Sequence, residues 1–180
     1  FSPCGGTTLI DMMYRMKRTE LINLLLPLNE KLYQMAYCLI PDDLQAEQLV
    51  IDGVNAFLLK EAKWVAQFTE GEVDPKQAAK LRRQLLKKIL KFQFEIGQKR
   101  SFQLIDQYRS YIPAEFKKFY DLDVKVRAVM TLRFDFLFQM EEIEDICQMA
   151  RFEVIEKLHN GRFMLSKDLS TTRITSETHA

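Results

Sequence analysis

Apolar residues recur at intervals of three and four along most of the chain, and this period predicts α-helices. The first predicted helix spans residues 19–40 and carries an apolar stripe from Leu21 to Leu39. Pro27 lies inside it. An interior proline removes a backbone hydrogen bond, so we expect a kink or a break there. No clear run has the two-residue alternation of a β-strand, which favours an all-α fold.

Proline and acidic residues mark the borders of the next helices. The segment Pro41-Asp42-Asp43 ends the first helix, and either aspartate is placed to cap a second helix over 44–64. The polar residues 69–75 predict a loop, and Pro75 is expected to open a long third helix that ends near residue 100. Three shorter helices are predicted nearer the C-terminus, over 123–134, 140–147 and 150–165.

These elements predict an all-α protein of two small helical domains. The length of 180 residues allows one medium domain or two small ones. Residues 101–122 are mixed in composition and contain Pro113, so they are the best candidate for a linker, with room for one or two short helices. We expect a flexible extension over 1–15, a first domain over 16–100, the linker over 101–122, a second domain over 123–166 and a polar tail over 167–180.

The formal net charge is only +1, but charge is unevenly distributed along the chain. Between residues 75 and 100 there are nine lysines and arginines and a single acidic residue, Glu95. Such a basic helix attracts phosphate backbones through counterion release. Phe92 and Phe94 interleave with the cations, a combination typical of single-stranded nucleic-acid binding. The alternative is a solvated helix face with phenylalanines in the core, and these residues alone leave both interpretations open.

The sequence offers no support for catalysis, metal binding or a membrane span. Cys4, Cys38 and Cys147 lie far apart, and the only histidines are His159 and His179, so neither disulfides nor a zinc site are indicated. There is no glycine-rich phosphate loop and no nucleophile–base pair, so we expect no enzyme, no cofactor and no small-molecule substrate. No apolar run approaches the roughly 18 residues of a membrane span. A reduced, cytoplasmic setting is the expectation.

The second predicted domain has the pattern of a helix-turn-helix. The segment MEEIEDICQM is the candidate support helix, and ARFEVIEKLHNGRFML is the candidate recognition helix, which such motifs place in the DNA major groove. The stretch resembles the promoter-binding domain of extracytoplasmic-function sigma factors, which are bacterial transcription-initiation proteins. The residues that carry the resemblance are Leu132, Arg133, Glu141, Glu142, Ile143, Val154, Leu158, His159, Gly161, Arg162 and Leu165.

The first predicted domain resembles the same family independently. Its segment LYQMAYCLIPDDLQAEQLVID matches the family pattern at Leu32, Tyr33, Ala36, Tyr37, Leu39, Ala46, Glu47, Leu49, Val50 and Asp52. The basic helix LRRQLLKKILKFQFEIGQKR looks like the helix with which these factors hold and melt promoter DNA. The two matches follow the order of the family and together cover about residues 16–166.

The resemblance implies partners and roles for particular residues. The helix with Glu47, Gln48 and Asp52 would dock on the clamp coiled coil of RNA polymerase core. An anti-sigma factor is a further partner that the resemblance implies. Each implied residue is equally compatible with an ordinary surface charge. Promoter DNA would be bound by Arg82, Arg83, Lys87, Lys88, Lys91, Lys99 and Arg100 of the basic helix and by Arg151, Lys157 and Arg162 of the recognition helix.

The chain departs from the family pattern in ways that leave a second interpretation open. Gln48 replaces an acidic residue, and Gln148 stands where the helix-turn-helix usually has glycine. Residues 127–165 include seven acidic and five basic side chains, so phosphate should repel this domain at long range. The alternative is a degenerate sigma-like protein that acts as an interaction regulator or a dimer without promoter binding. The apolar segment 134–138 favours it as a partner surface, unless it belongs to the core.

Overall fold

The computed structural model describes residues 21–66, 75–108 and 112–166, and within these ranges it contains helices and turns but no strand. The prediction of an all-α fold is therefore confirmed. The expected extension over 1–15 and the tail over 167–180 lie outside the described residues, as does nearly all of the predicted loop over 69–75. The α-helices are α2 (Asn29–Leu39), α3 (Asp43–Lys60), α4 (Ala62–Ala66), α5 (Pro75–Tyr108), α6 (Lys117–Tyr120), α7 (Val124–Met130), α8 (Met140–Cys147) and α9 (Arg151–Ser166).

The helix borders follow from the residues at them. Pro27 lies in a 3₁₀ turn, η1 (Leu26–Leu28), which interrupts the first predicted helix as an interior proline should. The Asp42 carboxylate accepts the backbone N–H of Gln45 at 2.9 Å and so caps α3. Helix α5 starts at Pro75 as predicted but continues to Tyr108, so the beginning of the expected linker is helical.

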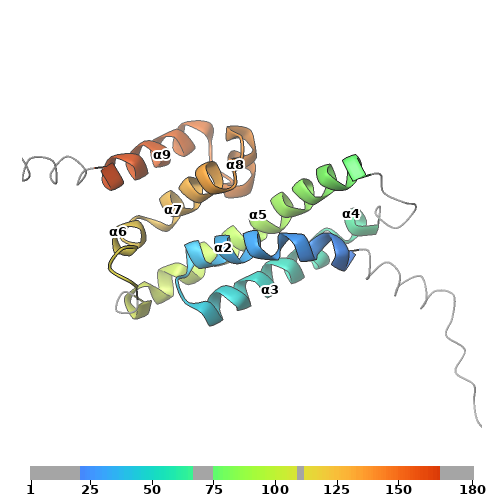
Figure 1. Ribbon diagram of the computed structural model, residues 1–180, viewed down its shortest axis with the longest axis horizontal. Helices are drawn as coiled ribbons and strands as arrows, with labels where there is room; N and C mark the ends of the chain where they lie inside the picture. The colour runs from blue at the N-terminus through green and yellow to red at the C-terminus, as the bar shows by residue number, and fades with distance from the viewer. Residues whose placement is uncertain (1–20, 67–74, 109–111, 167–180) are drawn as a thin grey trace, which may run out of the picture.

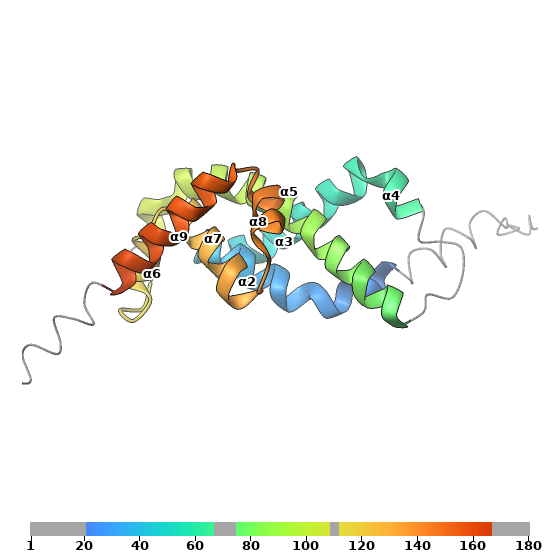
Figure 2. The same ribbon diagram turned by 90° about the horizontal axis from the view of Figure 1, so that it is seen from above.

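Two groups of helices pack side by side (Figure 1). Helices α2, α3 and α5 form one bundle, and α7, α8 and α9 lie together along it, with α6 in the connection between them (Figures 1 and 2). A π-helical turn, η3 (Thr131–Asp135), follows α7. Both predicted domains contribute buried side chains to one continuous apolar cluster, so the structure does not show a division between them. The cluster includes Leu32, Leu49, Phe57, Ile89, Phe94, Val129, Phe138, Ile146 and Val154.

Two glycines allow helices to approach closely. A Cβ atom at Gly97 of α5 would lie 2.6 Å from Cδ1 of Leu39 and 2.9 Å from Cδ2 of Leu49. A Cβ atom at Gly161 of α9 would lie 2.8 Å from the sulfur of Met130 on α7. All three distances are shorter than van der Waals contact, so a side chain at either glycine would displace these neighbours.

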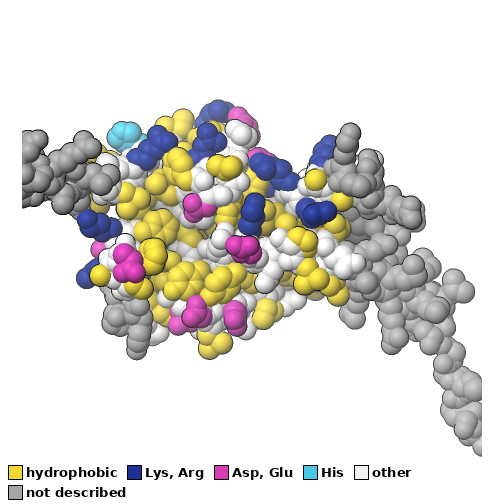
Figure 3. Space-filling model, viewed as in Figure 1, with side chains coloured by type: hydrophobic (Ala, Val, Ile, Leu, Met, Phe, Trp, Pro, Cys, Tyr) yellow, Lys and Arg dark blue, Asp and Glu magenta, His cyan; other side chains and the backbone are white. Residues whose placement is uncertain are grey.

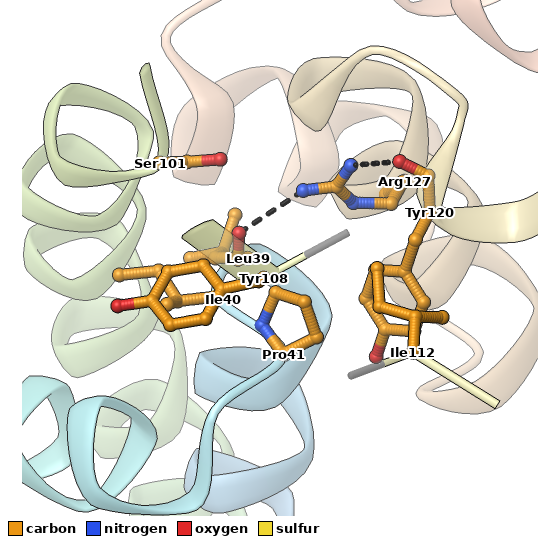
Figure 4. A pocket seen from close by; sticks show the side chains of 8 residues that line it. All are labelled: Leu39, Ile40, Pro41, Ser101, Tyr108, Ile112, Tyr120 and Arg127. Atoms are coloured by element: carbon orange, nitrogen blue, oxygen red, sulfur yellow. Dashed lines mark hydrogen bonds between the residues drawn. The ribbon is translucent and has the colours of Figure 1, made fainter. Parts of the chain in front are cut away.

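A buried arginine joins the two groups of helices. Arg127 of α7 is 1% exposed, and its Nε and Nη2 donate to the carbonyls of Cys38 (2.9 Å) and Leu39 (3.0 Å) at the end of α2. Its Nη1 donates to the carbonyls of Tyr120 (3.0 Å) and Leu122 (2.8 Å). Figure 4 shows the bonds to Leu39 and Tyr120. The last carbonyls of a helix lack intrahelical partners and carry the negative end of its dipole, so they suit a guanidinium.

The role of Arg127 is structural rather than ligand-binding. The cavity beside it, lined also by Ser101 and Tyr108, measures about 10 Å³. This is the room of about one water molecule and excludes an anion such as phosphate. Burial lowers the pKa of Arg127, yet arginine stays charged in proteins because its ordinary pKa is so high. The charge is held by four carbonyl dipoles in place of a carboxylate.

Candidate functional site

The predicted polymerase-binding residues lie on α3 in two different environments. Glu47 and Gln48 are exposed. Asp52 accepts a hydrogen bond from Nε2 of Gln48 at 3.0 Å and forms an ion pair with Arg100 of α5. Asp52 thus ties α3 to α5 and also holds the Gln48 side chain, whereas Glu47 is exposed to a partner.

The same side of α3 carries an exposed apolar stripe that the sequence analysis missed. Leu44, Ile51 and Leu59 are 73%, 53% and 82% exposed. They are spaced seven and eight residues apart, which places them on one face about two turns from each other. Their signal in the sequence was an apolar period out of phase with the core positions of the helix. We define the docking face as Leu44, Glu47, Gln48, Ile51 and Leu59.

The cations of α5 that were predicted to bind DNA are paired with acidic residues of α8. Nε and Nη2 of Arg83 donate to the two carboxylate oxygens of Glu142 at 2.9 and 2.6 Å. The guanidinium also lies 4.8 Å from the centre of the Phe138 ring. The hydrogen bond from Arg83 holds the pKa of Glu142 below its usual range. Glu142 accepts the backbone N–H of Gln139 as well, so the same carboxylate caps α8.

A second acidic residue of α8 continues this contact. Nζ of Lys91 donates to Oδ1 of Asp145 at 3.1 Å, and Nζ of Lys87 lies 3.9 Å from Oδ2. Arg83, Lys87 and Lys91 lie four residues apart and therefore share one face of α5. We call this contact the charge seam: Arg83, Lys87 and Lys91 of α5 against Glu142 and Asp145 of α8.

The remaining predicted cations of α5 also have acidic partners or are partly buried. Lys88 pairs with Glu61 at 2.9 Å, and Lys99 pairs with Glu95 at 3.4 Å. The Nε of Arg82 is buried without a hydrogen-bond acceptor among the described residues. The strongly basic helix of the sequence is therefore largely neutralised by its neighbours in the fold.

Two of the three predicted DNA contacts of α9 have partners within the fold. Arg151 pairs with Glu141 of α8 at 3.0 Å, and the guanidinium of Arg162 lies 4.9 Å from the centre of the Phe134 ring. Lys157 is half-buried, and the structure gives it no ion pair among the described residues. The three cations consequently do not form a joint basic surface.

The exposed surface of α9 is mixed. Phe152, Ile155, Phe163 and Met164 are exposed, as are polar neighbours such as His159 and Arg162, whereas Val154 is buried against the core. Base edges in the major groove are read mainly through hydrogen bonds, which the apolar side chains cannot make. The predicted recognition helix therefore exposes both apolar and hydrogen-bonding side chains.

Two further sequence features are explained by the local backbone. Gln148, at the turn where glycine was expected, has φ 51°, so the left-handed turn is made with a non-glycine residue. The apolar segment 134–138 is divided: Phe136 and Phe138 are buried, and Phe134 and Leu137 are exposed. The segment therefore contributes two rings to the core and two apolar side chains to the surface.

No cluster of three or more metal-ligating side chains occurs among the described residues, and none of the described helices is long and apolar enough to cross a membrane. Comparison with models of protein families found no match for this chain, and comparison with curated proteins found none either. Inferences about function therefore depend on the residues and geometry above.

We expect the charge seam to appear in a double-mutant cycle as a coupling free energy between Arg83 and Glu142. In a double-mutant cycle, Arg83→Gln and Glu142→Gln should be coupled by ~1 kcal/mol in urea unfolding, a modest value because Arg83 is 47% exposed. The pKa of Glu142 is depressed, so its contribution is present above the ordinary glutamate pKa and is lost as the pH falls through the lower folded pKa.

The matched control is Lys80→Gln, an exposed cation of the same helix, combined with Glu142→Gln. This pair should show no coupling. A cycle that gives no coupling for Arg83 and Glu142 at pH 7 and low salt would contradict the seam.

Proposed function

We propose that this chain is a sigma-like transcription factor that binds RNA polymerase core through the docking face of α3. The observation that carries the proposal is the exposed stripe of Leu44, Ile51 and Leu59 beside Glu47. Apolar residues spaced at seven and eight fit between the ridges of another helix. An unpartnered stripe of this kind suits a coiled coil, which is the part of the polymerase that the sequence resemblance implies.

Promoter contact by α5 is the second part of the proposal and requires a change in the charge seam. Arg83, Lys87 and Lys91 cannot neutralise phosphates while Glu142 and Asp145 hold them, because the pairing already satisfies the cations. We therefore propose that α5 binds DNA only when α8 moves away. Docking on the polymerase through α3 is independent of this movement, since α8 and α3 use different faces of the bundle.

The alternative is a sigma-like interaction protein without promoter binding. The observation in its favour is the exposure of the large apolar side chains Phe152, Ile155 and Phe163 on α9. The acidic excess of residues 127–165 also opposes phosphate binding. Both proposals include a protein partner, but only the first includes binding to promoter DNA.

We expect Ile51→Glu to weaken binding to RNA polymerase core by at least about tenfold, because it places a charge in the centre of the docking face. The measurement is a pull-down or biolayer titration of purified core with the full chain. Ile51 is exposed, so the variant should fold normally, as checked by circular dichroism. Reversing the charge of Asp52 would be less informative, because it would also break the ion pair with Arg100.

The matched control is Phe152→Glu, another exposed apolar position, on α9, which should bind core like the wild type. Failure of the folded wild type to bind core would contradict the polymerase proposal. Equal loss in the two variants would locate the effect outside the docking face.

We expect Glu142→Gln/Asp145→Asn to raise affinity for duplex DNA by about tenfold at low salt and to steepen the dependence on salt concentration by about two ion equivalents, because freed cations displace counterions. The control Glu115→Gln/Glu156→Gln changes net charge equally at exposed positions away from the seam. The readout is fluorescence anisotropy. Equal effects of the two variants, or no DNA binding by either, would favour the interaction protein.

A further inference from the structure

An open groove outside the docking face and the charge seam is lined with aromatic side chains. It lies between α2, the α6 region and η3 and measures about 780 Å³. Its rings are Tyr33 and Tyr37 of α2 together with Phe116, Phe119 and Tyr120. The volume is in the range of ligand-binding clefts, so the groove can accept a side chain or a short segment of another molecule.

The rings form a connected series. Tyr33 and Tyr37 are stacked with centroids 6.0 Å apart, and Tyr37 meets Tyr120 edge to face at 6.3 Å. Phe119 meets Tyr120 edge to face at 5.3 Å. Each of these four rings contacts a neighbour, and the Tyr120 hydroxyl also donates to the Tyr37 carbonyl at 3.2 Å. Because the rings are prearranged, little conformational entropy is lost when a ligand binds.

The lining of the groove carries a negative charge. Asp135 is the only carboxylate in the described lining, which contains no lysine, arginine or histidine. The structure gives Asp135 no ion pair among the described residues. At one edge the Tyr33 hydroxyl donates to Oδ1 of Asp43 at 2.6 Å, and this bond raises the pKa of Tyr33 to about 12, so the hydroxyl stays neutral.

The wider surface agrees with this charge. On the face shown in Figure 3, hydrophobic side chains gather over α2 with acidic side chains among them, and cations gather mainly over α5 and the C-terminal helices. Two neighbouring cations have ring contacts of their own: Lys31 lies over the Phe136 ring, and the buried Arg127 lies over the Tyr120 ring, which lines the groove. Lys117 and Lys118 of α6 are outside the lining.

We propose that the groove binds an arginine or lysine side chain presented by a segment of a partner protein. The faces of aromatic rings carry negative potential and attract a cation within about 6 Å, and Asp135 adds a formal charge for it to pair with. An open groove suits a protein segment, because sites for small molecules enclose most of their ligand. This site is separate from the docking face and does not depend on the polymerase proposal.

The test is isothermal titration of the full chain with the peptide acetyl-Gly-Arg-Gly-Arg-Gly-amide. The matched peptide has citrulline, a neutral isostere, in place of each arginine. We expect the arginine peptide to bind at least about fivefold more tightly, because cation–ring attraction and the ion pair are lost in citrulline. Aromatic NMR shifts of Tyr33 and Tyr37 report whether the peptide enters the groove.

Three variants locate the site. Asp135→Asn and Phe119→Leu should each weaken binding of the arginine peptide by about three- to tenfold, and Glu156→Gln, an exposed acid on α9, should leave it unchanged. Circular dichroism melting checks that each variant folds. Equal binding of the two peptides, equal weakening by Glu156→Gln, or no binding at millimolar peptide overturns the proposal. Free arginine amide that binds as tightly as the peptide overturns the assignment to a protein segment.

Discussion

The hydrogen bonds of Arg127 hold the two halves of the chain together. A guanidinium that is 1% exposed would be costly without partners, and here four carbonyls from the end of α2 and the turn after α6 satisfy it. Those carbonyls also need donors, because they close helices or turns in a buried place. These hydrogen bonds position α7 against α2, and α7 in turn packs against α8 and α9.

The position of α8 decides what α5 can do. Once α7 is fixed against α2, Glu142 and Asp145 come within reach of Arg83, Lys87 and Lys91. A helix with nine cations in its first 26 residues thereby becomes one side of an internal contact. Three of the exposed surfaces among the described residues are the docking face of α3, the apolar residues of α9 and the aromatic groove, and we propose protein partners for them.

The sequence predicted the helices well because their signals are local. Pro27, Asp42 and Pro75 each act through the backbone of their own turn, and the structure places them as expected. The pairing of α5 with α8 was out of reach, because ion pairs such as Arg83–Glu142 join residues far apart in the sequence and depend on packing. The role of Arg127 was out of reach for the same reason. The exposed stripe of α3 was visible as spacing, but only burial shows which apolar residues lack a partner.

The most direct test is hydrogen exchange during urea unfolding of Arg127→Met, compared with Lys125→Met at an exposed position of α7. The account predicts that Arg127→Met lowers the free energy of unfolding by more than ~3 kcal/mol, because it orphans four buried carbonyls. Protection should fall together in α2, α5 and α7–α9, and Lys125→Met should change little. Loss of protection confined to α7–α9, or a destabilisation no larger than that of Lys125→Met, would contradict one core joined by Arg127.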